Sequence, residues 1–362
     1  MKICYILTEI ANGGAERVVL NLCQYFSAHG DDVSLVSLKA INEQNPIYRE
    51  FAALNIPIYS ANISKWNIFN YFQLGKIIRK INPEIIHSHL FHGNILSRLL
   101  KRDKKTCRLV NTIHIMEYRK SAFWRFKLDA ITFKLCDVHT SVALSTAEFQ
   151  SKKLNVPIDS FKIIKNGINL PSKLTAEKID FFRRKFNLDN YHKVIGSVGR
   201  LDYQKGFDRF LELLPQFESI VPDGEKWAYL LIGDGVETDK LKSIHKKCHT
   251  DKIEVIFAGF YPEANSMIGL FDCFVMPSRS EGYPLVLLEA MSHGVPILVN
   301  NISCIIEALT DYPNYAVTDF FNNSSETIAE SLAEMLKKNK IEYSSVATVA
   351  EMAENYKKTA YL

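Results

Sequence analysis

The chain lacks the residue patterns that mark several common classes of protein. Its seven cysteines form no CxxC pair and their number is odd, which argues against a disulfide framework and favours free thiols in a reducing compartment. No apolar run approaches the length of a membrane span, and no GxGxxG follows an early strand. No Asp-x-Asp triplet is present to hold a divalent ion. These absences disfavour disulfide-rich, membrane-spanning and dinucleotide-dependent proteins.

Charge is unevenly distributed along the chain. Residues 1–170 hold 23 Lys and Arg against 13 Asp and Glu, whereas residues 171–362 hold 21 against 27. The first part is therefore basic and the second acidic, although the whole chain carries only +4. Such asymmetry indicates that one part meets an anionic surface or substrate. The asymmetry is explained equally well if both parts of the chain have solvated surfaces and neither binds a charged partner.

Short β-rich runs alternate with amphipathic helical patterns along the 362 residues, which are too many for one ordinary domain. This alternation predicts parallel sheets with helices on both faces, in two consecutive doubly wound domains that meet near residues 167–192. Ligands of such sheets lie beyond the carboxyl ends of the strands, and we expect the site in the cleft between the domains. The expected strands are Ile3–Leu7, Asp32–Leu38, Glu84–His87, Arg108–His114, Val138–Ala143 and Lys162–Ile164, then Val194–Val198, Ala228–Ile232, Ile253–Phe257, Cys273–Met276 and Pro296–Val299.

Two glutamates eight positions apart, Glu281 and Glu289, flank the start of an apolar helix. A turn at Gly282 and Pro284 opens this helix, whose first N–H groups are available to an anion. Eight residues make a little over two helical turns, so we expect Glu281 at the rim of a crevice and Glu289 deeper on the same side. The alternative is a loop glutamate and a solvated helix glutamate, and the apolar residues around Glu289 argue against it.

Arg200 and Lys205 bracket the loop after the first strand of the second domain. Two such cations can neutralise one diphosphate without a metal, although a solvated pair is the alternative. Gly14 and Gly233 follow other strands and permit close approach of the backbone to a ligand. Each of these glycines is explained almost as well by a simple tight turn.

Histidines gather in the first domain. His114 ends a strand and can hydrogen-bond a sugar hydroxyl or donate to phosphate, although a lone histidine is more often structural. His87, His89 and His92 resemble a loose metal cluster, but no nearby acid supplies a further ligand. We therefore predict no metal site.

A basic stretch with interleaved aromatic residues runs from Lys101 to Lys134, with ten Lys and Arg against three Asp and Glu. It fits a surface helix on anionic lipid, whereas nucleic acid is disfavoured because no known nucleic-acid module surrounds it. A helix that packs its aromatics into the domain is an equal alternative. The residues expected at the membrane or acceptor side are Arg119, Lys120, Trp124, Arg125 and Lys127.

In their order and spacing these motifs resemble the retaining glycosyltransferases of family 4. The motifs are Gly13-Gly14-Ala15-Glu16, His114, Gly199-Arg200 with Lys205-Gly206, and Glu281 with Glu289-Ala290-Met291. The resemblance spans most of the chain and implies the α/β GT-B fold, with two Rossmann-like domains facing a cleft. It places the acceptor-side domain at 1–170, the nucleotide-sugar domain at 171–345, and at 346–362 a helix that returns to the first domain. Residues 301–307 depart from the family, because relatives often carry glycines there.

The resemblance also implies a role for each site residue. Arg200 and Lys205 would bind the donor diphosphate, and Glu289 would bind the ribose hydroxyls. Glu281 would lie at the donor sugar, and His114 would assist near the reacting centre. The remaining donor-binding positions would be Gly14, Gly233, Gly282, Tyr283, Pro284 and Leu285.

The implied reaction is hexosyl transfer with retention, without cofactor or metal, from a nucleotide diphosphate sugar to a glycan or lipid-linked acceptor of surface polysaccharide or lipopolysaccharide synthesis. UDP is the expected nucleotide. We expect a cytoplasmic enzyme, peripheral on the inner face of the plasma membrane, with no nucleic-acid partner. The alternatives are a nucleotide-sugar epimerase of similar fold, which would convert donor without acceptor, and an inactive sugar-nucleotide-binding membrane scaffold, against which the intact charged motifs argue.

Overall fold

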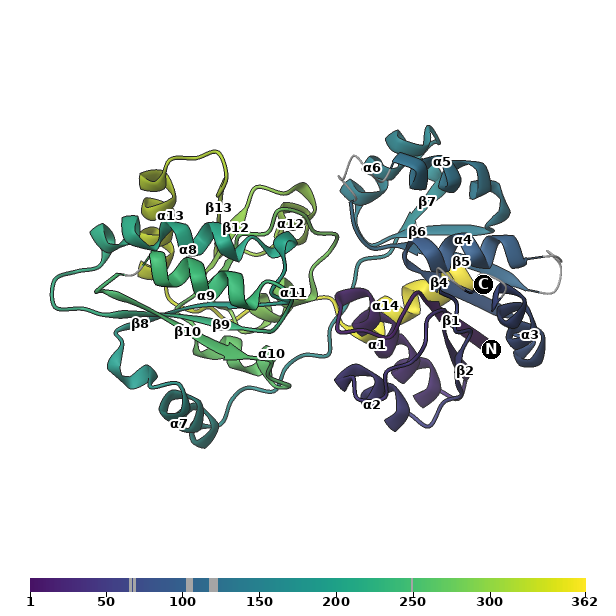
Figure 1. Cartoon of the computed structure of the whole chain (residues 1–362), viewed down its shortest axis with the longest axis horizontal. Helices are drawn as coiled ribbons and strands as arrows, with labels where there is room; N and C mark the ends of the chain where they lie inside the picture. Colours follow the sequence, from purple (N-terminus) through teal and green to yellow (C-terminus); the bar gives the residue numbers. More distant parts are fainter. Residues whose placement is uncertain (65–66, 68–69, 102–106, 117–122, 249) are drawn as a thin grey trace. The chain divides into compact units, whose positions relative to one another are not determined.

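The computed structural model describes residues 1–64, 67, 70–101, 107–116, 123–248 and 250–362. The chain forms two compact units (Figure 1). Unit 1 contains Met1–Asn169 and Ala347–Leu362, and unit 2 contains Leu170–Val346. Within the described ranges, no helix is long and apolar enough to cross a membrane.

Unit 1 is built on a parallel sheet whose order, over the described residues, is β3-β2-β1-β4-β5-β6-β7. Helices α1 and α2 cover one face and α3, α4, α5 and α6 cover the other (Figure 1). The strands are β1 Lys2–Leu7, β2 Asp32–Ser37, β3 Ile58–Ser60, β4 Ile85–His89, β5 Arg108–Ile113, β6 Val138–Ser141 and β7 Phe161–Ile163. The helices are α1 Gly14–Ala28, α2 Pro46–Ala53, α3 Tyr71–Ile81, α4 Leu90–Leu100, α5 Phe123–Thr132 and α6 Leu144–Leu154.

Unit 2 repeats this plan with a parallel sheet ordered β10-β9-β8-β11-β12-β13 over its described part. Its apolar core lies between the sheet and the inner faces of α8 and α13. The strands are β8 Lys193–Val198, β9 Trp227–Ile232, β10 Ile253–Gly259, β11 Cys273–Met276, β12 Ile297–Asn300 and β13 Tyr315–Thr318. The helices are α7 Ala176–Lys185, α8 Phe207–Phe217, α9 Thr238–Lys247, α10 Ala264–Met267, α11 Leu285–Ser292, α12 Ser303–Ala308 and α13 Ser325–Lys337.

Apolar patterning explains most of these elements. All six residues of β9 are buried, as expected for a central strand covered on both faces. Helix α8 buries Phe207, Phe210 and Leu214 at helical spacing. Two strands absent from our prediction, β3 and β13, lie at sheet edges, where part of each strand remains half-buried or exposed. The two strands are only three and four residues long, and neither forms a continuous buried run, so apolar pattern alone did not reveal them.

The C-terminal helix α14, Val349–Tyr356, belongs to unit 1 and packs on α1, which confirms the predicted return of the chain. A capping box between Thr348 and Glu351 starts the helix. Tyr361 lies in the core of unit 1, where its hydroxyl is 2.7 Å from His87 Nδ1 and 3.1 Å from the Tyr5 hydroxyl. Unit 1 therefore depends on both ends of the chain.

In each sheet the strand order reverses direction at one place, between β1 and β4 in unit 1 and between β8 and β11 in unit 2. The loops after these strands diverge to opposite faces and leave a crevice at the carboxyl ends. Ligands of doubly wound sheets bind at this position. The predicted loops that contain Arg200, Lys205 and Glu281 follow β8 and β11 and therefore lie at the reversal in unit 2.

Candidate functional site

Lys205 and Glu281 form an ion pair at the reversal point of unit 2, with Lys205 Nζ 2.7 Å from Glu281 Oε1. Ser278 donates its hydroxyl to the same carboxylate oxygen at 2.7 Å. The carboxylate is buried, since Glu281 is only 5% exposed. Lys205 and Ser278 both bind the same oxygen, Oε1, and together they fix the position of the carboxylate.

The local backbone explains how Lys205 reaches this position. Asp202 caps the short turn Tyr203–Lys205 by accepting from the Lys205 N–H at 3.3 Å. Gly206 then takes a φ of 70°, and a Cβ there would collide with the Pro277 carbonyl. Only glycine combines this conformation with so close an approach to the other loop. The β8 and β11 loops are thereby held together.

A second ion pair braces the same two loops. Arg279 donates to both carboxylate oxygens of Asp208, at 2.7 and 2.9 Å, and its guanidinium stacks 4.0 Å from the centre of the Tyr203 ring. Burial by itself would raise the pKa of Asp208, but the hydrogen bonds and charge of Arg279 outweigh it and lower that pKa. Arg279 and Asp208 were not among the predicted site residues, although both lie at the ends of these same loops.

The predicted depths of the two motif glutamates are wrong. Glu281 is buried, whereas Glu289 on α11 is half-buried. Spacing along the helix placed both on one side, but the turn before α11 folds Glu281 inward against Lys205 and Ser278. No side chain caps the start of α11 at Pro284, so its first N–H groups keep their capacity for an anion.

Arg200 stands at the solvent side of the β8 loop, with its side chain 53% exposed and its Nε 2.5 Å from Asp202 Oδ2.

Gly233 follows β9 and has a φ of 147°, and a Cβ there would collide with the Gly199 carbonyl. Gly233 is therefore required by packing of the two loops, whatever else its backbone does. The structure brings Arg200, Lys205, Gly233 and Glu281 into neighbouring loops of unit 2.

In unit 1, His114 follows β5 and pairs with His89 of β4, whose Nδ1 lies 2.8 Å from His114 Nε2. The other ring nitrogen of His89 is buried without a partner in the described structure. An unpaired buried N–H costs more than an unpaired acceptor, so we assign the His89 proton to Nδ1. His114 then accepts on Nε2 and carries its own proton on Nδ1. Burial lowers the pKa of His114 to about 4, so it is a neutral donor at pH 7.

The remaining histidines do not converge as a metal cluster. His87 is bonded to Tyr361 and Thr112, and His92 lies edge-on to Phe91. Within the part of the chain that the structure describes, no group of three or more His, Cys, Asp or Glu side chains is placed to hold a metal ion. All seven cysteines are free thiols.

Gly14 begins α1 of unit 1, after β1. A Cβ at this glycine would meet no atom within 4 Å, so the protein itself leaves space beside it. The preceding Gly13 is different, because a Cβ there would collide with the Glu16 carboxylate. The space beside Gly14 is therefore accessible to a ligand, while Gly13 serves the local packing of α1.

The basic aromatic stretch is split between surface and interior. Arg119 and Lys120 lie outside the described residues. Trp124 on α5 is 52% exposed and Phe123 is 64% exposed, with Lys127 Nζ 4.5 Å from the centre of the Phe123 ring. In contrast, Phe133 stacks on His139 at 3.7 Å within unit 1. One part of the stretch thus forms an exposed aromatic and basic surface, and another part packs inside.

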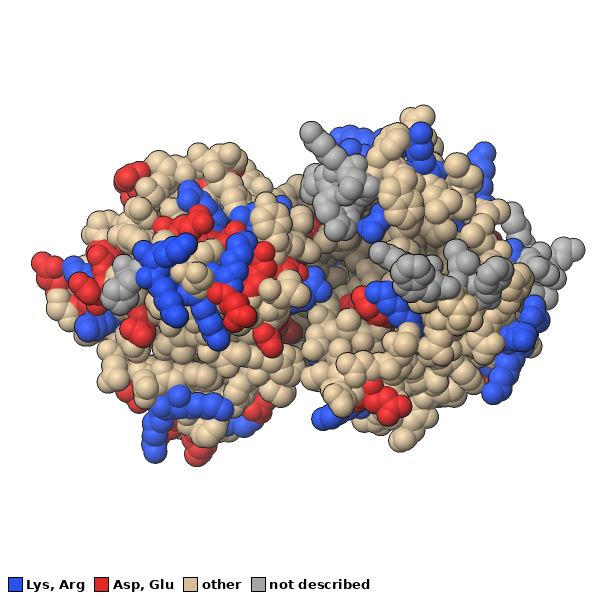
Figure 2. Space-filling view, in the orientation of Figure 1, with Lys and Arg blue, Asp and Glu red and all other residues tan. Residues whose placement is uncertain are grey.

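The acidic character of the second part of the chain does not create an acidic face in the view of Figure 2. Basic and acidic side chains are interspersed there over α8 and α9 of unit 2. Ion pairs such as Lys240 with Glu237 account for this mixing. Net charge alone therefore does not locate a ligand on this surface.

Comparison with known proteins follows the same division of the chain. Residues 178–361 match the Glycosyl transferases group 1 family, and residues 12–171 match Glycosyltransferase Family 4. The UDP-Gal:alpha-D-GlcNAc-diphosphoundecaprenol alpha-1,3-galactosyltransferase of Escherichia coli is 25% identical over 319 residues, covering 85% of this chain and 82% of that protein. The N,N'-diacetylbacillosaminyl-diphospho-undecaprenol alpha-1,3-N-acetylgalactosaminyltransferase of Campylobacter jejuni is 23% identical over 323 residues, covering 84% and 82%.

Solved structures share the fold. A structure of Anabaena HepE in complex with UDP and glucose superposes with a TM-score of 0.77 at 15% identity, covering 100% of this chain and 95% of that one. WaaG, a glycosyltransferase involved in lipopolysaccharide biosynthesis, superposes with a TM-score of 0.70 at 15% identity, covering 99% and 95%. Two doubly wound units with a C-terminal helix returned to the first define the GT-B class. The chain belongs to the Glycosyl transferases group 1 family, and the predicted glycosyltransferase identity is confirmed.

Sequence reasoning missed Ser278 altogether, and it considered His89 only as a metal ligand and not as a partner of His114. Ser278, which holds Glu281, and His89, which pairs with His114, both end a buried strand or follow it closely. Their position could have identified them from the sequence, because polar residues at the carboxyl ends of parallel strands face the ligand side of the sheet. Their partners were not evident because they come from other strands.

Proposed function

We propose that this glycosyltransferase moves a sugar, with retention and without a metal, from a UDP-sugar to an undecaprenyl-diphosphate-linked glycan in surface-polysaccharide assembly. The observation that carries the proposal is the Lys205–Glu281 pair at the reversal point of a unit belonging to this family. The activities by which the Escherichia coli and Campylobacter jejuni relatives are named support the lipid-linked acceptor. The UDP in the HepE structure supports the nucleotide.

In this proposal, unit 2 holds the donor. Arg200 and Lys205 bind the diphosphate, Glu289 binds the ribose, and the uncapped start of α11 at Gly282–Leu285 faces the donor sugar phosphate. Gly233 lets the β9 loop approach the nucleotide closely. Each assignment places a cation or free N–H group against an anion, or a carboxylate against hydroxyls.

Bond cleavage transfers negative charge to the departing diphosphate. Lys205 and Arg200 stabilise this charge by electrostatic attraction and hydrogen bonding, which removes the need for a divalent ion. Lys205 is paired with Glu281 in the structure, so diphosphate binding makes the ammonium shared between two anions. Glu281 stays fixed by Ser278 and can accept a hydroxyl of the donor sugar.

On the unit 1 side, His114 acts as a neutral hydrogen-bond donor through Nδ1 and does not act as a cation. Gly14 leaves room for a phosphate at the start of α1. The exposed Phe123, Trp124 and Lys127 of α5 make a weak anionic-lipid contact that keeps the enzyme near its lipid-linked acceptor.

A ligand screen followed by product analysis tests the proposal. Thermal unfolding with UDP-, GDP- and ADP-sugars should show the largest stabilisation with one UDP-sugar, because a ligand that binds only the folded state raises its stability. The same donor should be consumed quickly only when an undecaprenyl-diphosphate-linked glycan is added. Conversion of the donor to its epimer without acceptor, or stabilisation by GDP- or ADP-sugars alone, would contradict the proposal. Binding of a UDP-sugar with no turnover on any lipid-linked glycan would indicate a scaffold.

A further inference from the structure

Strand β4 passes directly into helix α4 in unit 1, with His89 as the last residue of the strand and Leu90 as the first of the helix. The chain therefore changes direction without a loop. Leu90 makes this turn in the left-handed region, with a φ of 66°. Among the described residues other than glycine, six have a positive φ, and the five besides Leu90 are all asparagines. Asparagine tolerates this conformation far better than leucine does, so contacts on either side must impose the turn.

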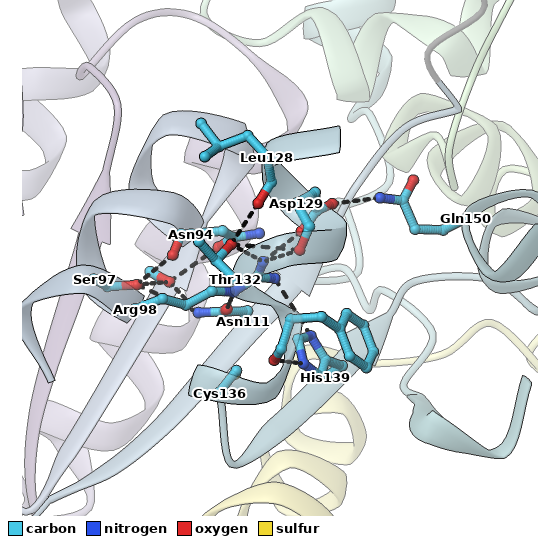
Figure 3. Close-up of polar contacts among 12 residues, drawn as sticks. Asn94, Ser97, Arg98, Asn111, Leu128, Asp129, Thr132, Cys136, His139 and Gln150 are labelled. Carbon is cyan, nitrogen blue, oxygen red and sulfur yellow. Dashed lines mark hydrogen bonds and ion pairs between the residues drawn. The ribbon is translucent and has the colours of Figure 1, made fainter. Parts of the chain in front are cut away.

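One set of contacts holds α4 against the sheet (Figure 3). Ser88 donates its hydroxyl to Asn94 Oδ1 at 2.9 Å and lies 2.9 Å from Ser97 Oγ. Asn111 of β5 donates to the Ser88 hydroxyl at 2.6 Å and accepts from Arg98 Nε at 2.6 Å. All five residues are buried. Helix α4 is thus tied to β4 and β5 from its second turn onward, which leaves Leu90 to reverse the chain.

Arg98 extends the same network to α5 and α6. It pairs with Asp129, and the other carboxylate oxygen of Asp129 accepts from Gln150 Nε2 at 2.5 Å (Figure 3). Thr132 Oγ1 accepts from Arg98 Nη1 at 3.1 Å. A shift of α4 that relaxed the turn at Leu90 would therefore break several buried hydrogen bonds, which is costly in the interior of a protein.

The His89 side chain lies on the opposite face of β4 from Ser88, because successive residues of a strand point to opposite faces. The His89 residue is 0% exposed, and its ring centre lies 4.1 Å from that of His87 and 6.1 Å from that of Tyr5. His87 is itself bonded through both ring nitrogens to other buried side chains. His89 therefore packs against a fixed neighbour, and its Nδ1 meets His114 Nε2 at 2.8 Å.

His89 differs from other buried histidines of unit 1. His87 and His139 each use both ring nitrogens in hydrogen bonds. His89 Nε2 has no partner among the described residues, so within them this ring bonds only to His114. A histidine kept for the fold alone would be expected to satisfy both nitrogens. The unmade bond and the left-handed leucine are two costs at adjacent residues, and such costs persist where the geometry serves a site.

We propose that His89 is a positioning residue of the transfer reaction. The turn at Leu90 fixes its ring, and its Nδ1–H group holds His114 in the tautomer whose own proton lies on Nδ1. Without this bond His114 would exchange between two tautomers. The placement of His114 by His89 does not depend on the proposed function, whereas its consequence for sugar transfer does.

Nitrogen NMR of the full chain with isotope-labelled histidine reads the tautomer directly. Long-range proton–nitrogen spectra at pH 7 distinguish a protonated ring nitrogen from an unprotonated one. The spectrum of His114→Gln assigns the His114 signals by their absence. In the wild-type chain His114 should show a protonated Nδ1 and an unprotonated Nε2.

Two amide substitutions at His89 separate the hydrogen bond from packing. In His89→Asn the new amide lies near the place of Nδ1 and can still donate to His114, whereas in His89→Gln it reaches towards the place of Nε2. His89→Asn should retain the wild-type tautomer of His114, and His89→Gln should give a mixture of both. His29→Gln, at an exposed histidine of unit 1, is the matched control and should leave the His114 signals unchanged.

Turnover of a UDP-sugar with its acceptor connects the tautomer to the reaction. His89→Gln should lower kcat by up to about 100-fold, because a small misplacement of a group at the reacting centre has an effect of this size. The KM of the donor should change less, since the donor is held by unit 2 in the proposed function. His89→Asn should regain most of the kcat that His89→Gln loses.

The turn is tested separately through Leu90. Leu90→Asn accepts a left-handed backbone and should retain the His114 tautomer. The β-branched side chain introduced by Leu90→Val opposes this backbone and should release His114 to the mixture. Both variants keep His89 itself, so they decide the inference if His89→Gln does not fold. Urea unfolding shows which variants are folded.

Three results overturn the inference: a proton on His114 Nε2 in the wild-type chain, the wild-type tautomer in folded His89→Gln, or equal mixtures in His89→Asn and His89→Gln. The wild-type tautomer in Leu90→Val overturns the part assigned to the turn. If the tautomers change as expected while kcat does not, the placement of His114 stands and its role in the proposed function fails. If no UDP-sugar is turned over, the proposed function fails and the tautomer alone decides the inference.

Discussion

The ammonium of Lys205 and the carboxylate of Glu281 are bonded at 2.7 Å across 76 residues of sequence. They meet because β8 and β11 are neighbours in the sheet, so the loops after these strands share one crevice. Neither partner is well exposed, with side-chain exposures of 17% and 7%. Removal of one partner therefore affects both the fold and the site.

Lys205→Met should reduce turnover and stability together. Loss of the cation at the diphosphate removes about 2–4 kcal/mol of transition-state stabilisation. The buried Glu281 left without its partner costs about 1–3 kcal/mol of unfolding free energy. Urea unfolding and donor turnover measure the two effects. The double variant Lys205→Met with Glu281→Gln should regain most of the stability and none of the activity, and recovery of activity would remove Lys205 from the chemistry.

Arg200→Ala should slow turnover, because it removes about 2–4 kcal/mol of transition-state stabilisation. The free energy of unfolding should change by less than about 0.5 kcal/mol. The physical reason is its exposure, because the arginine side chain is 53% exposed and solvent weakens its ion pair with Asp202. Arg184→Ala is the matched control, an exposed arginine paired with Asp180 in unit 2. Equal turnover in both variants would show that Arg200 does not bind the diphosphate.

Saturating EDTA should leave sugar transfer largely unchanged. In the proposed site Arg200 and Lys205 stabilise the charge that develops on the leaving diphosphate, which is the role that a divalent ion has in metal-dependent enzymes. The test compares turnover of the untreated enzyme, of the enzyme in EDTA, and of the EDTA-treated enzyme after addition of manganese. Restoration by manganese of an enzyme inactivated with EDTA is the result that contradicts this prediction.

Acid should weaken unit 1 below pH 6.5. Burial, reinforced by Arg98, lowers the pKa of His139 to about 3, and burial lowers that of His114 to about 4. Between these values and pH 6.5 the unfolded chain binds protons that the folded chain does not, so stability falls as the pH falls. Each such histidine contributes at most about 1.4 kcal/mol per pH unit in that range. Urea unfolding at pH 7, 6 and 5 measures the slope.

His139→Gln should make that slope shallower, because it removes one of the titrating groups. His29→Gln, at an exposed histidine of unit 1, is the control and should leave the slope as it is. An unchanged slope in His139→Gln would show that protonation of this histidine is not coupled to folding.

Binding to anionic vesicles should depend on α5. Phe123→Ser with Lys127→Ser should weaken flotation at low salt, because an exposed base near an anionic surface contributes about 1 kcal/mol and the aromatic ring enters the headgroup layer. Phe181→Ser with Lys185→Ser is a matched pair on unit 2, where Phe181 is 55% exposed and Lys185 lies over its ring. Equal flotation on neutral and anionic vesicles, or an equal loss in the control pair, would leave α5 as an ordinary surface helix.

The fold was largely predictable from local patterns. Buried strands such as β9 are continuous apolar runs, and α8 repeats its apolar residues at helical spacing, so each element is visible within its own segment. Strands β3 and β13 were missed because each is short and neither forms a continuous buried run. The loops with Arg200, Lys205 and Glu281 were found because glycine and proline mark turns locally.

The sequence by itself thus determined the two sets of strands and helices, the family, and the loops that contain the charged site residues. Only the tertiary structure decided which side chains meet. Glu281 is more buried than Glu289 because it turns inward to Lys205. The tautomer of His114 is defined because His89, 25 residues earlier, lies on the neighbouring strand. Asp129 gains its orientation from Arg98, 31 residues away. Such contacts depend on strand order and on helix packing across the sheet, and residue spacing along one segment has no information about either.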